Sequence, residues 1–414
     1  MSFTDRQSTY MMGALPTVGG RRLAVRVTNS AEKALRQGHP WLFANGITSI
    51  SESGAAGDLA VIFDRKRRFL AIGLYDPDSP IQIKVLQHLQ SATINADWFS
   101  ATITAALAKR QPLADSGHTN GYRCINGEND RLPALIVDRY AHVAVVKLYS
   151  PCWLPHLTTI LDTLRAQLPI THLVIRLSRR LQAQKLPVQD GQVVYGSPID
   201  APVLFRENGL AFEADVIRGQ KTGHFLDQRD NRARVGALSK GKRVLDVFAA
   251  TGGFSLYAAS GGAKQVVSVD LSRPTLAVAE RNFAHNQDRP TVRRCEHQLA
   301  AGDAFEVLKR LRAQKRRFDV VVVDPPAFAQ KQADVPQALR AYARLAQLAS
   351  KVVADGGTLV LASCSSRVSA EVFFKTVQDA LPHTARRLTT TAHAIDHPVT
   401  FKEGAYLKCA YFQL

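Results

Sequence analysis

Cysteine is scarce in this chain, and the arrangement of the few cysteines excludes several kinds of site. There are five, and no two of them form a C-x-x-C pair: Cys124, Cys152, Cys295, Cys364 and Cys409. We therefore expect no zinc site of the usual spacing and predict no bound metal. An odd, sparse set of cysteines is typical of a protein from a reducing compartment.

Long apolar runs are also missing. No run approaches the ~20 apolar residues that a membrane span requires, and the first 30 residues contain no uninterrupted apolar segment of signal-peptide length. We also find no internal repeat and no long low-complexity tract. These absences predict a cytoplasmic protein that does not contact a membrane.

Acidic residues are too few to balance the basic ones. The chain has 53 Lys and Arg against 35 Asp and Glu, which gives a formal net charge of +18. A basic excess of this size indicates a polyanionic partner, most often nucleic acid. The 414 residues are 46% hydrophobic, enough for packed cores and for two to three domains.

The G-x-G-x-x-G signature of dinucleotide-binding folds is absent, and a related turn takes its place. An apolar run ends near Asp246, and the small-residue turn Thr251-Gly252-Gly253 then leads into a helical pattern. Such a turn lets the backbone approach a ligand and places a helix N-terminus beside it. The next apolar run ends at Asp270, where an acid binds ribose hydroxyls in related folds. The altered spacing favours an adenosyl ligand without a pyrophosphate, which is S-adenosylmethionine (SAM).

From about residue 203 onward, strand-like and helical patterns alternate. Further strands are expected to end near Asp303, at Asp324 and at Ser363, and Asp355-Gly-Gly357 is expected to precede the last of these. This alternation predicts an α/β fold with a doubly wound, Rossmann-like parallel sheet, whose ligands lie at the carboxyl ends of the strands. Asp303 is placed either to accept a hydrogen bond from the adenine amine or to cap the following helix.

Two motifs at the carboxyl ends of predicted strands indicate substrate binding and catalysis. Asp324-Pro325-Pro326 has a rigid backbone without donors, so its carbonyls and carboxylate can face a nucleobase on which Phe328 stacks; the alternative is a rigid loop. Cys364 follows the next strand, where a thiolate can act as a nucleophile; the alternative is an inert, buried cysteine.

A polar, glycine-marked stretch, residues 218–232, precedes the first sheet strand and is too polar for a core element. It is expected either to close over the methionine end of SAM or to form a solvated lead-in helix. The full set of predicted cofactor-binding residues is Thr222, Phe225, Asp227, Gln228, Asp246, Phe248, Thr251, Gly252, Gly253, Asp270, Leu271, Asp303, Ala304 and Asp324.

The N-terminal half is predicted to contain a leader and two small domains. We predict a leader over residues 1–20 that is flexible, a small β-barrel over 21–95 with short strands and basic loops, and a linker helix with a small central α/β domain over 96–202. Residues 203–414 then form the methyltransferase domain.

The motifs together resemble one family, the RlmI-like bacterial methyltransferases that modify 23S ribosomal RNA at carbon 5 of cytosine. Gly38-His-Pro-Trp-Leu-Phe43 is similar to the opening of that family's RNA-binding PUA domain, and residues 127–139 to the signature of its central domain. Lys221-Thr-Gly-His-Phe-Leu-Asp-Gln-Arg229 is the most distinctive match. The resemblance supports Cys364 as the catalytic nucleophile and implies large-subunit ribosomal RNA as partner and a homodimer. Asp324 is the second catalytic candidate, because it can hydrogen-bond the target base and stabilise the adduct.

Three positions depart from the family pattern: Ala250, Ala327 and Ala346 stand where tyrosine, lysine and asparagine are usual. They leave other functions open. One is a SAM-dependent enzyme that methylates a purine amine in RNA, which would need no cysteine. Another is a non-catalytic RNA-binding ribosome assembly factor that retains a SAM fold. A small-molecule methyltransferase is less compatible with the charge.

Overall fold

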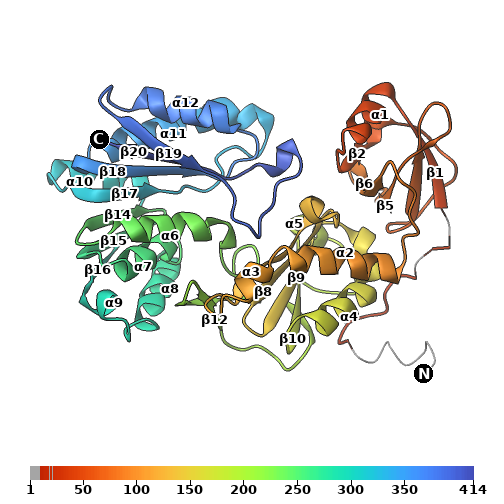
Figure 1. Cartoon of the computed structure of the whole chain (residues 1–414), viewed down its shortest axis with the longest axis horizontal. Helices are drawn as coiled ribbons and strands as arrows, with labels where there is room; N and C mark the ends of the chain where they lie inside the picture. Colours follow the sequence, from red (N-terminus) through yellow and green to blue (C-terminus); the bar gives the residue numbers. More distant parts are fainter. Residues whose placement is uncertain (1–9, 18, 21) are drawn as a thin grey trace. The chain divides into compact units, whose positions relative to one another are not determined.

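The chain forms two compact units in the computed structural model, which describes residues 10–17, 19–20 and 22–414 (Figure 1). The first unit extends to Arg206 and also takes in Ala214–Leu226 and Ile395–Phe401. These last two segments were assigned by sequence to the C-terminal domain. Hydrogen bonds hold them in the first unit: Thr222 donates to Asp138, and the Asp396 carbonyl accepts from Arg110.

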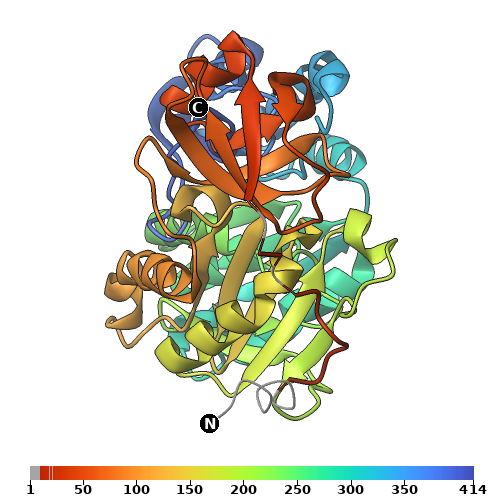
Figure 2. The ribbon, with the colours of Figure 1, turned by 90° about the vertical axis from the view of Figure 1, so that its right-hand side faces the viewer.

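The first sheet of this unit is the predicted β-barrel. Its strands run in the order β2-β6-β5-β4-β1-β3, and only the short 3-10 turn η2 (Ala44–Gly46) separates the two edge strands β2 and β3. The turn therefore draws the two edges together and curls the sheet, which faces the viewer in Figure 2. The elements are β1 (Arg22–Val27), α1 (Asn29–Arg36), β2 (Trp41–Phe43), β3 (Ile47–Ile50), β4 (Leu59–Phe63), β5 (Phe69–Tyr75) and β6 (Ile81–His88).

The second sheet of this unit belongs to the predicted central domain. Its order is β11-β10-β9-β8-β7, with β9 and β10 parallel and the other neighbours antiparallel. The elements are α2 (Ala96–Ala108), α3 (Gln111–Ala114), β7 (Gly121–Asn126), η3 (Gly127–Asp130), β8 (Leu135–Tyr140), β9 (Val143–Leu148), η4 (Pro151–His156), α4 (Leu157–Gln167), β10 (His172–Leu177), α5 (Arg179–Gln182) and β11 (Gln192–Tyr195).

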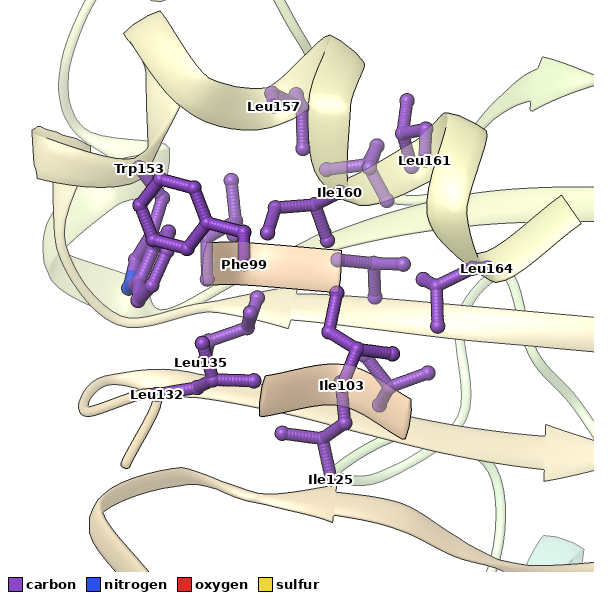
Figure 3. Close-up of a cluster of buried hydrophobic side chains, with 14 of the residues drawn as sticks. Phe99, Ile103, Ile125, Leu132, Leu135, Trp153, Leu157, Ile160, Leu161 and Leu164 are labelled. Atoms are coloured by element: carbon purple, nitrogen blue, oxygen red, sulfur yellow. The ribbon is translucent and has the colours of Figure 1, made fainter. Parts of the chain in front are cut away.

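Barrel and central domain share one core. Ile72, Leu74 and Leu86 of the barrel belong to the same buried cluster as the central sheet and helices. Figure 3 shows its centre, where the leucines and Ile160 of α4 face Phe99 and Ile103 of α2. Part of the predicted leader joins this core: Tyr10 is buried and its hydroxyl donates to Asp162 at 2.6 Å, so this stretch is not a solvated tail.

Trp153 anchors this core. Its ring is fully buried against Phe99, and its indole N–H donates to the Pro133 carbonyl at 2.8 Å. We expect Trp153→Ala to lower the free energy of unfolding by about 3–5 kcal/mol, because it leaves a cavity and an unpaired carbonyl. Urea denaturation measures this, with Trp98→Ala on partly exposed Trp98 as control. Equal losses in both variants would contradict the assignment of Trp153 as the anchor.

The second unit contains the predicted doubly wound sheet. Its seven strands run in the order β16-β15-β14-β17-β18-β20-β19; β14 to β18 are parallel, and β20 is antiparallel to both of its neighbours. The strands are β14 (Arg243–Val247), β15 (Gln265–Asp270), β16 (Glu296–Ala301), β17 (Phe318–Val323), β18 (Val353–Ser363), β19 (Arg386–Thr391) and β20 (Lys408–Gln413). The hairpin β12 (Val203–Glu207) and β13 (Leu210–Ala214) precedes this sheet in the chain.

Helices cover both faces of this sheet, as Figure 1 shows. α10 to α12 pack with the strands in one large core, and α6 to α8 pack on the other side, against each other and against β14 to β16. The helices are α6 (Arg229–Leu238), α7 (Gly253–Ser260), α8 (Arg273–Ala284), α9 (Pro290–Arg294), α10 (Ala304–Ala313), α11 (Val335–Ser350) and α12 (Ala370–Ala380), with the 3-10 turns η5 (Leu226–Gln228), η6 (Gln332–Asp334) and η7 (Lys402–Gly404).

One boundary in this unit was predicted wrongly. Asp355-Gly-Gly357 does not precede the strand that leads to Cys364 but lies inside it. Phe318 pairs with Val353, and Val320 pairs with Thr358, so β18 holds extra residues opposite two positions of β17. Gly356, at φ +71°, accommodates this irregularity, since other residues rarely adopt such a backbone conformation.

Candidate active site

The turn between β14 and α7 is built from unusual backbone angles. Phe248, Ala250 and Gly252 all have positive φ, at 65°, 47° and 77°. At Gly252 a Cβ atom would lie 2.7 Å from the Cβ of Ala279 on α8, so only glycine fits. The turn folds back tightly over the carboxyl end of β14, and α7 begins directly after Gly252.

Asp246 lies beneath this turn, one residue before the end of β14, and a chain of hydrogen bonds orients it. Its Oδ2 accepts from the Ser255 backbone N–H at 3.0 Å and from the Ser255 hydroxyl at 2.7 Å. Because Ser255 uses its proton there, the Ser268 hydroxyl donates to Ser255 at 2.6 Å, and His297 Nε2 donates to Ser268 at 2.8 Å. Burial lowers the pKa of His297 to about 4, so its ring is neutral at physiological pH.

The other oxygen of Asp246 is the clearest sign of a ligand. Oδ1 is buried and has no hydrogen-bond partner among the residues that the structure describes, and the residue is fully buried. Burial raises the pKa of Asp246 to about 6, although the bonds from Ser255 act against the rise. A buried carboxylate oxygen without a donor is costly, and an ammonium group would satisfy it. The α-amino group of SAM is such a donor, so this site fits SAM.

Asp270 and Leu271 follow β15, the neighbouring strand. The Asp270 carboxylate accepts from the backbone N–H groups of Ala250 at 3.0 Å and Ser272 at 2.9 Å, which ties it to the turn. Leu271 is 75% exposed, although it is a large apolar side chain. A ribose diol bound by Asp270 and an adenine covering Leu271 would use both features.

Asp303 caps α10, one of its two predicted roles. Its Oδ1 accepts from the backbone N–H groups of Phe305 and Glu306 at 3.0 and 3.1 Å. Both bonds go to the same oxygen. The second predicted role, a hydrogen bond from the adenine amine to Asp303, is compatible with this cap and stays a prediction. Ala304, the first residue of α10, is buried.

Asp324-Pro325-Pro326 follows β17, the neighbour of β14 on its other side. Gln228 Nε2 donates to Asp324 Oδ2 at 2.9 Å, and Asn231 in turn donates to Gln228 at 2.6 Å. Phe328 is half-buried and lies against Tyr342 of α11, with ring centroids 5.1 Å apart. Its predicted stacking on a base stays untested.

Cys364 follows β18, directly beside Asp324-Pro325. Its Sγ lies 4.0 Å from the Pro325 carbonyl oxygen, and it is the one cysteine of the five that is not buried. Burial raises the pKa of the other four thiols, to about 11 for Cys295 and about 12 for the rest. The reactive candidate is therefore the cysteine at the carboxyl end of the sheet.

The polar stretch 218–232 is largely buried from Thr222 onward, so the solvated lead-in helix, one of its two expected roles, was predicted wrongly. Its buried members include Thr222, Asp227 and Gln228. Thr222 and Phe225 belong to the first unit, where the Thr222 hydroxyl donates to Asp138 at 2.6 Å and Lys221 lies over the Phe225 ring. Asp227 belongs to the second unit and accepts from the Tyr406 hydroxyl at 2.9 Å. Their contacts to SAM stay predictions.

The three departures from the family pattern lie in different surroundings. Ala250 donates its N–H to Asp270, so the turn keeps its backbone bond without a large side chain. Ala346 is fully buried in the core of the second unit, and Ala327 is exposed after the two prolines.

Sequence reasoning missed Ser255, Ser268 and His297, the residues that hold Asp246. It also missed Lys408, which bonds the turn that carries Cys364. Small hydroxyl residues in apolar runs were the available signal for the serines. His297 lies on β16 and Lys408 on β20, both distant in sequence from the residues they support. Only the order of the strands in the sheet brings His297 near Asp246 and Lys408 near Cys364. Within the described part of the chain, no group of three or more His, Cys, Asp or Glu side chains could hold a metal ion. In that same part, no helix is long and apolar enough to cross a membrane.

Comparison with known proteins defines the class. A family model described as S-adenosylmethionine-dependent methyltransferase matches residues 122–396, more than half of the chain, and a PUA-like domain model matches residues 25–88. The chain belongs to the S-adenosylmethionine-dependent methyltransferase family, and its N-terminal barrel is a PUA-like domain.

Two relatives in this family have names that refer to methylation of ribosomal RNA. The chain is 45% identical over 408 residues to "Ribosomal RNA large subunit methyltransferase" of Deinococcus radiodurans, covering 96% of this chain and 99% of that protein. It is 35% identical over 391 residues to "Ribosomal RNA large subunit methyltransferase I" of Pseudoalteromonas translucida, covering 93% and 98%.

Solved structures support the fold. A Streptococcus mutans protein provisionally described as a SAM-dependent methyltransferase superposes with a TM-score of 0.80 at 22% identity, covering 94% of this chain and 100% of that one. A crystal structure of a provisionally described methyltransferase complexed with SAH gives the same TM-score and identity, covering 95% and 100%.

Proposed function

We propose that this protein transfers a methyl group from SAM to carbon 5 of a cytosine in large-subunit (23S) ribosomal RNA, through a covalent bond to Cys364. The observation that carries the proposal is the position of Cys364. It is the one cysteine that is not buried, and it adjoins Asp324-Pro-Pro at the edge of the sheet that holds the SAM turn. The relatives named as ribosomal RNA methyltransferases and the net charge of +18 support the RNA class.

Residues of two neighbouring strands and the turns after them would hold SAM. The unpartnered Asp246 Oδ1 would accept from its amino group, Asp270 would bind the ribose hydroxyls and the exposed Leu271 would cover the adenine. Bound SAM supplies an electrophilic methyl group. The glycine at position 252 lets the backbone come close to it.

Cys364 makes carbon 5 nucleophilic. The aromatic cytosine ring does not attack a methyl group readily, so the thiolate first adds to carbon 6 and forms an S–C bond. The electrons of the carbon 5–carbon 6 double bond then move to carbon 5, which forms the new C–C bond to the methyl group as the bond from that methyl group to sulfur breaks and S-adenosylhomocysteine is left. Loss of the carbon 5 proton to a base returns its electron pair to the ring and expels the thiolate, which regenerates Cys364.

Asp324 positions the base. Its carboxylate follows the strand next to that of Cys364 and is bonded by Gln228 at 2.9 Å. In this proposal it hydrogen-bonds ring N3 or the exocyclic amine of cytosine and so stabilises the charge of the adduct. Paired RNA would hide carbon 6, so the target base must be unpaired or extruded.

Basic surfaces would hold the surrounding RNA through its phosphates, and this binding should weaken as salt rises. The PUA-like domain supports such a role. The proposed substrate is therefore an RNA in which one cytosine leaves its stack while basic surfaces of the protein hold the neighbouring phosphates.

The test is methyl transfer from labelled SAM to unmodified large-subunit ribosomal RNA, followed by nucleoside analysis. We expect label in 5-methylcytidine. Label in a methylated purine would move the protein to the amine-methylating enzymes, for which Asp-Pro-Pro is also suited. No label on naked RNA or on ribosomal particles would refute the catalytic proposal and favour an RNA-binding assembly factor.

A further inference from the structure

Lys408 is a buried lysine directly beneath the Cys364 turn. It begins β20, its backbone pairs with Ser363 of β18, and its side chain is 1% exposed. Its Nζ donates to three backbone carbonyls, those of Ser365, Val368 and Tyr406. An ammonium group has three donors, so all of them are used.

These bonds hold the turn that carries the cysteine. Ser365 and Val368 bracket most of the turn that follows β18, and the Ser365 carbonyl also accepts from the Val368 N–H at 3.4 Å. On its other side the turn is tied by the Ser365 hydroxyl, which donates to the Ala329 carbonyl at 3.1 Å. Cys364 is therefore fixed between β20 and the loop that follows Asp324-Pro-Pro.

The charge of Lys408 has no carboxylate beside it. Within the described residues, its bonding partners are carbonyl oxygens alone. Carbonyl dipoles stabilise a buried ammonium group only in part. Burial lowers the pKa of Lys408 to about 8, and Cys364 is the acidic group that acts to raise it. Such coupling is reciprocal, so the ammonium group stabilises the Cys364 thiolate by the same free energy.

Other charges near this turn act in both directions. Asp324 after β17, Tyr342 on α11 and Tyr406, whose hydroxyl donates to Asp227, are titratable groups near this turn, and both Cys364 and Asp324 act on Tyr342. Arg367, within the turn, is exposed. A carboxylate near a thiol opposes its ionisation, and the positive charge of Lys408 acts against this effect of Asp324.

We propose that Lys408 is a positioning residue of the active site, which fixes the Cys364 turn by three carbonyls and supplies the positive charge that stabilises the Cys364 thiolate. This inference rests on the proposed function, in which Cys364 is the nucleophile. In this proposal Lys408, on β20, supports catalysis without touching RNA or SAM.

The test is the pH dependence of Cys364 alkylation by iodoacetamide, followed by peptide mass spectrometry. The other four thiols are buried, so Cys364 is the one expected to react readily. In the wild type we expect half-maximal reactivity below ~8.5, the usual pKa of a cysteine. In Lys408→Met the midpoint should rise by at least about one unit, with reaction at pH 7 about tenfold slower.

Two controls accompany the variant. Lys408→Arg keeps the charge and should keep most of the wild-type profile, and Lys375→Met makes the same change at an exposed lysine of α12 and should leave the profile unchanged. The affinity for SAM should stay within about twofold in all variants.

Two results would overturn the proposal. The first is a folded Lys408→Met protein with a lower melting temperature but an unchanged alkylation profile, which would mean that Lys408 is only structural. The second needs no variant: a wild-type Cys364 that titrates at or above ~8.5. Methyl transfer by Cys364→Ala tests the proposed function separately, because alkylation of the wild type does not depend on activity.

Discussion

Replacement of Cys364 by alanine is expected to lower the rate of methyl transfer to RNA by at least about a thousandfold, with SAM still bound. Addition of the thiolate to carbon 6 is what makes carbon 5 nucleophilic, and alanine cannot form the S–C bond. SAM affinity should not change, because Asp246, Asp270 and Leu271 belong to the other strands β14 and β15 and the residues after them. Methyl transfer from labelled SAM and calorimetric SAM binding measure the two quantities.

A matched control is Cys295→Ala, which removes a buried thiol beside the edge strand β16 and should leave transfer unchanged. An RNA that carries 5-fluorocytidine adds a positive signature. After methyl addition its carbon 5 has no proton to lose, so the bond to Cys364 should persist on a denaturing gel. Full activity of Cys364→Ala, or an adduct that survives in that variant, would refute the covalent mechanism.

Replacement of Asp246 by asparagine is expected to weaken SAM binding about 30-fold at pH 8. The variant keeps the shape of the side chain but removes the negative charge that meets the amino group, and a hydrogen bond between charged groups contributes roughly 1.5–3 kcal/mol. Calorimetry or equilibrium dialysis with SAM measures the change. Asp379→Asn, at an exposed acid of α12, is the control and should bind SAM like the wild type.

The pH dependence of this site has a definite sign. The pKa of Asp246 is raised to about 6 in the folded protein, above its value of ~4 when unfolded. In the absence of SAM, the folded protein therefore binds more protons between pH 4 and 6. The contribution of this group to stability is complete below pH ~4 and is lost as the pH rises through about 6.

Asp246→Asn should remove this loss and leave the SAM-free protein as stable as the wild type, or more stable, at pH 8. SAM binding should show the opposite trend in the wild type, because it needs the ionised carboxylate and weakens below pH ~6. Thermal unfolding with and without SAM at pH 5 and pH 8 distinguishes the two effects. Unchanged SAM affinity in Asp246→Asn would contradict the assignment of Oδ1 to the amino group.

Much of the site was already implied by local pattern. A glycine turn after an apolar run, acids at the ends of two further runs, and a cysteine after another are properties of short segments. Parallel strands in such a sheet present their carboxyl ends at one edge. Once the alternation of strands and helices was recognised, Asp246, Asp270, Asp324 and Cys364 could be placed at that edge, and the structure confirms that they lie at the ends of β14, β15 and β17 or directly after β18.

The polar stretch before the sheet shows where local pattern misled. Residues 218–232 look solvated because charged and amide side chains dominate them. In the structure Arg232 is buried and paired with Glu207 at 2.7 Å, and Asn231 bonds Gln228. Burial of polar groups depends on partners supplied from elsewhere in the chain, and no window of the sequence contains those partners.

The sequence by itself determined the class of fold, the SAM turn and the candidate nucleophile, because each depends on residues close together in the chain. The tertiary structure alone decided how those groups are tuned. It brought His297 from β16 into the chain of bonds that orients Asp246, left Asp246 Oδ1 without a donor from any described residue, and placed Lys408 beneath the turn that carries Cys364. These effects come from burial and from charges on distant strands, and both exist only after the sheet has formed.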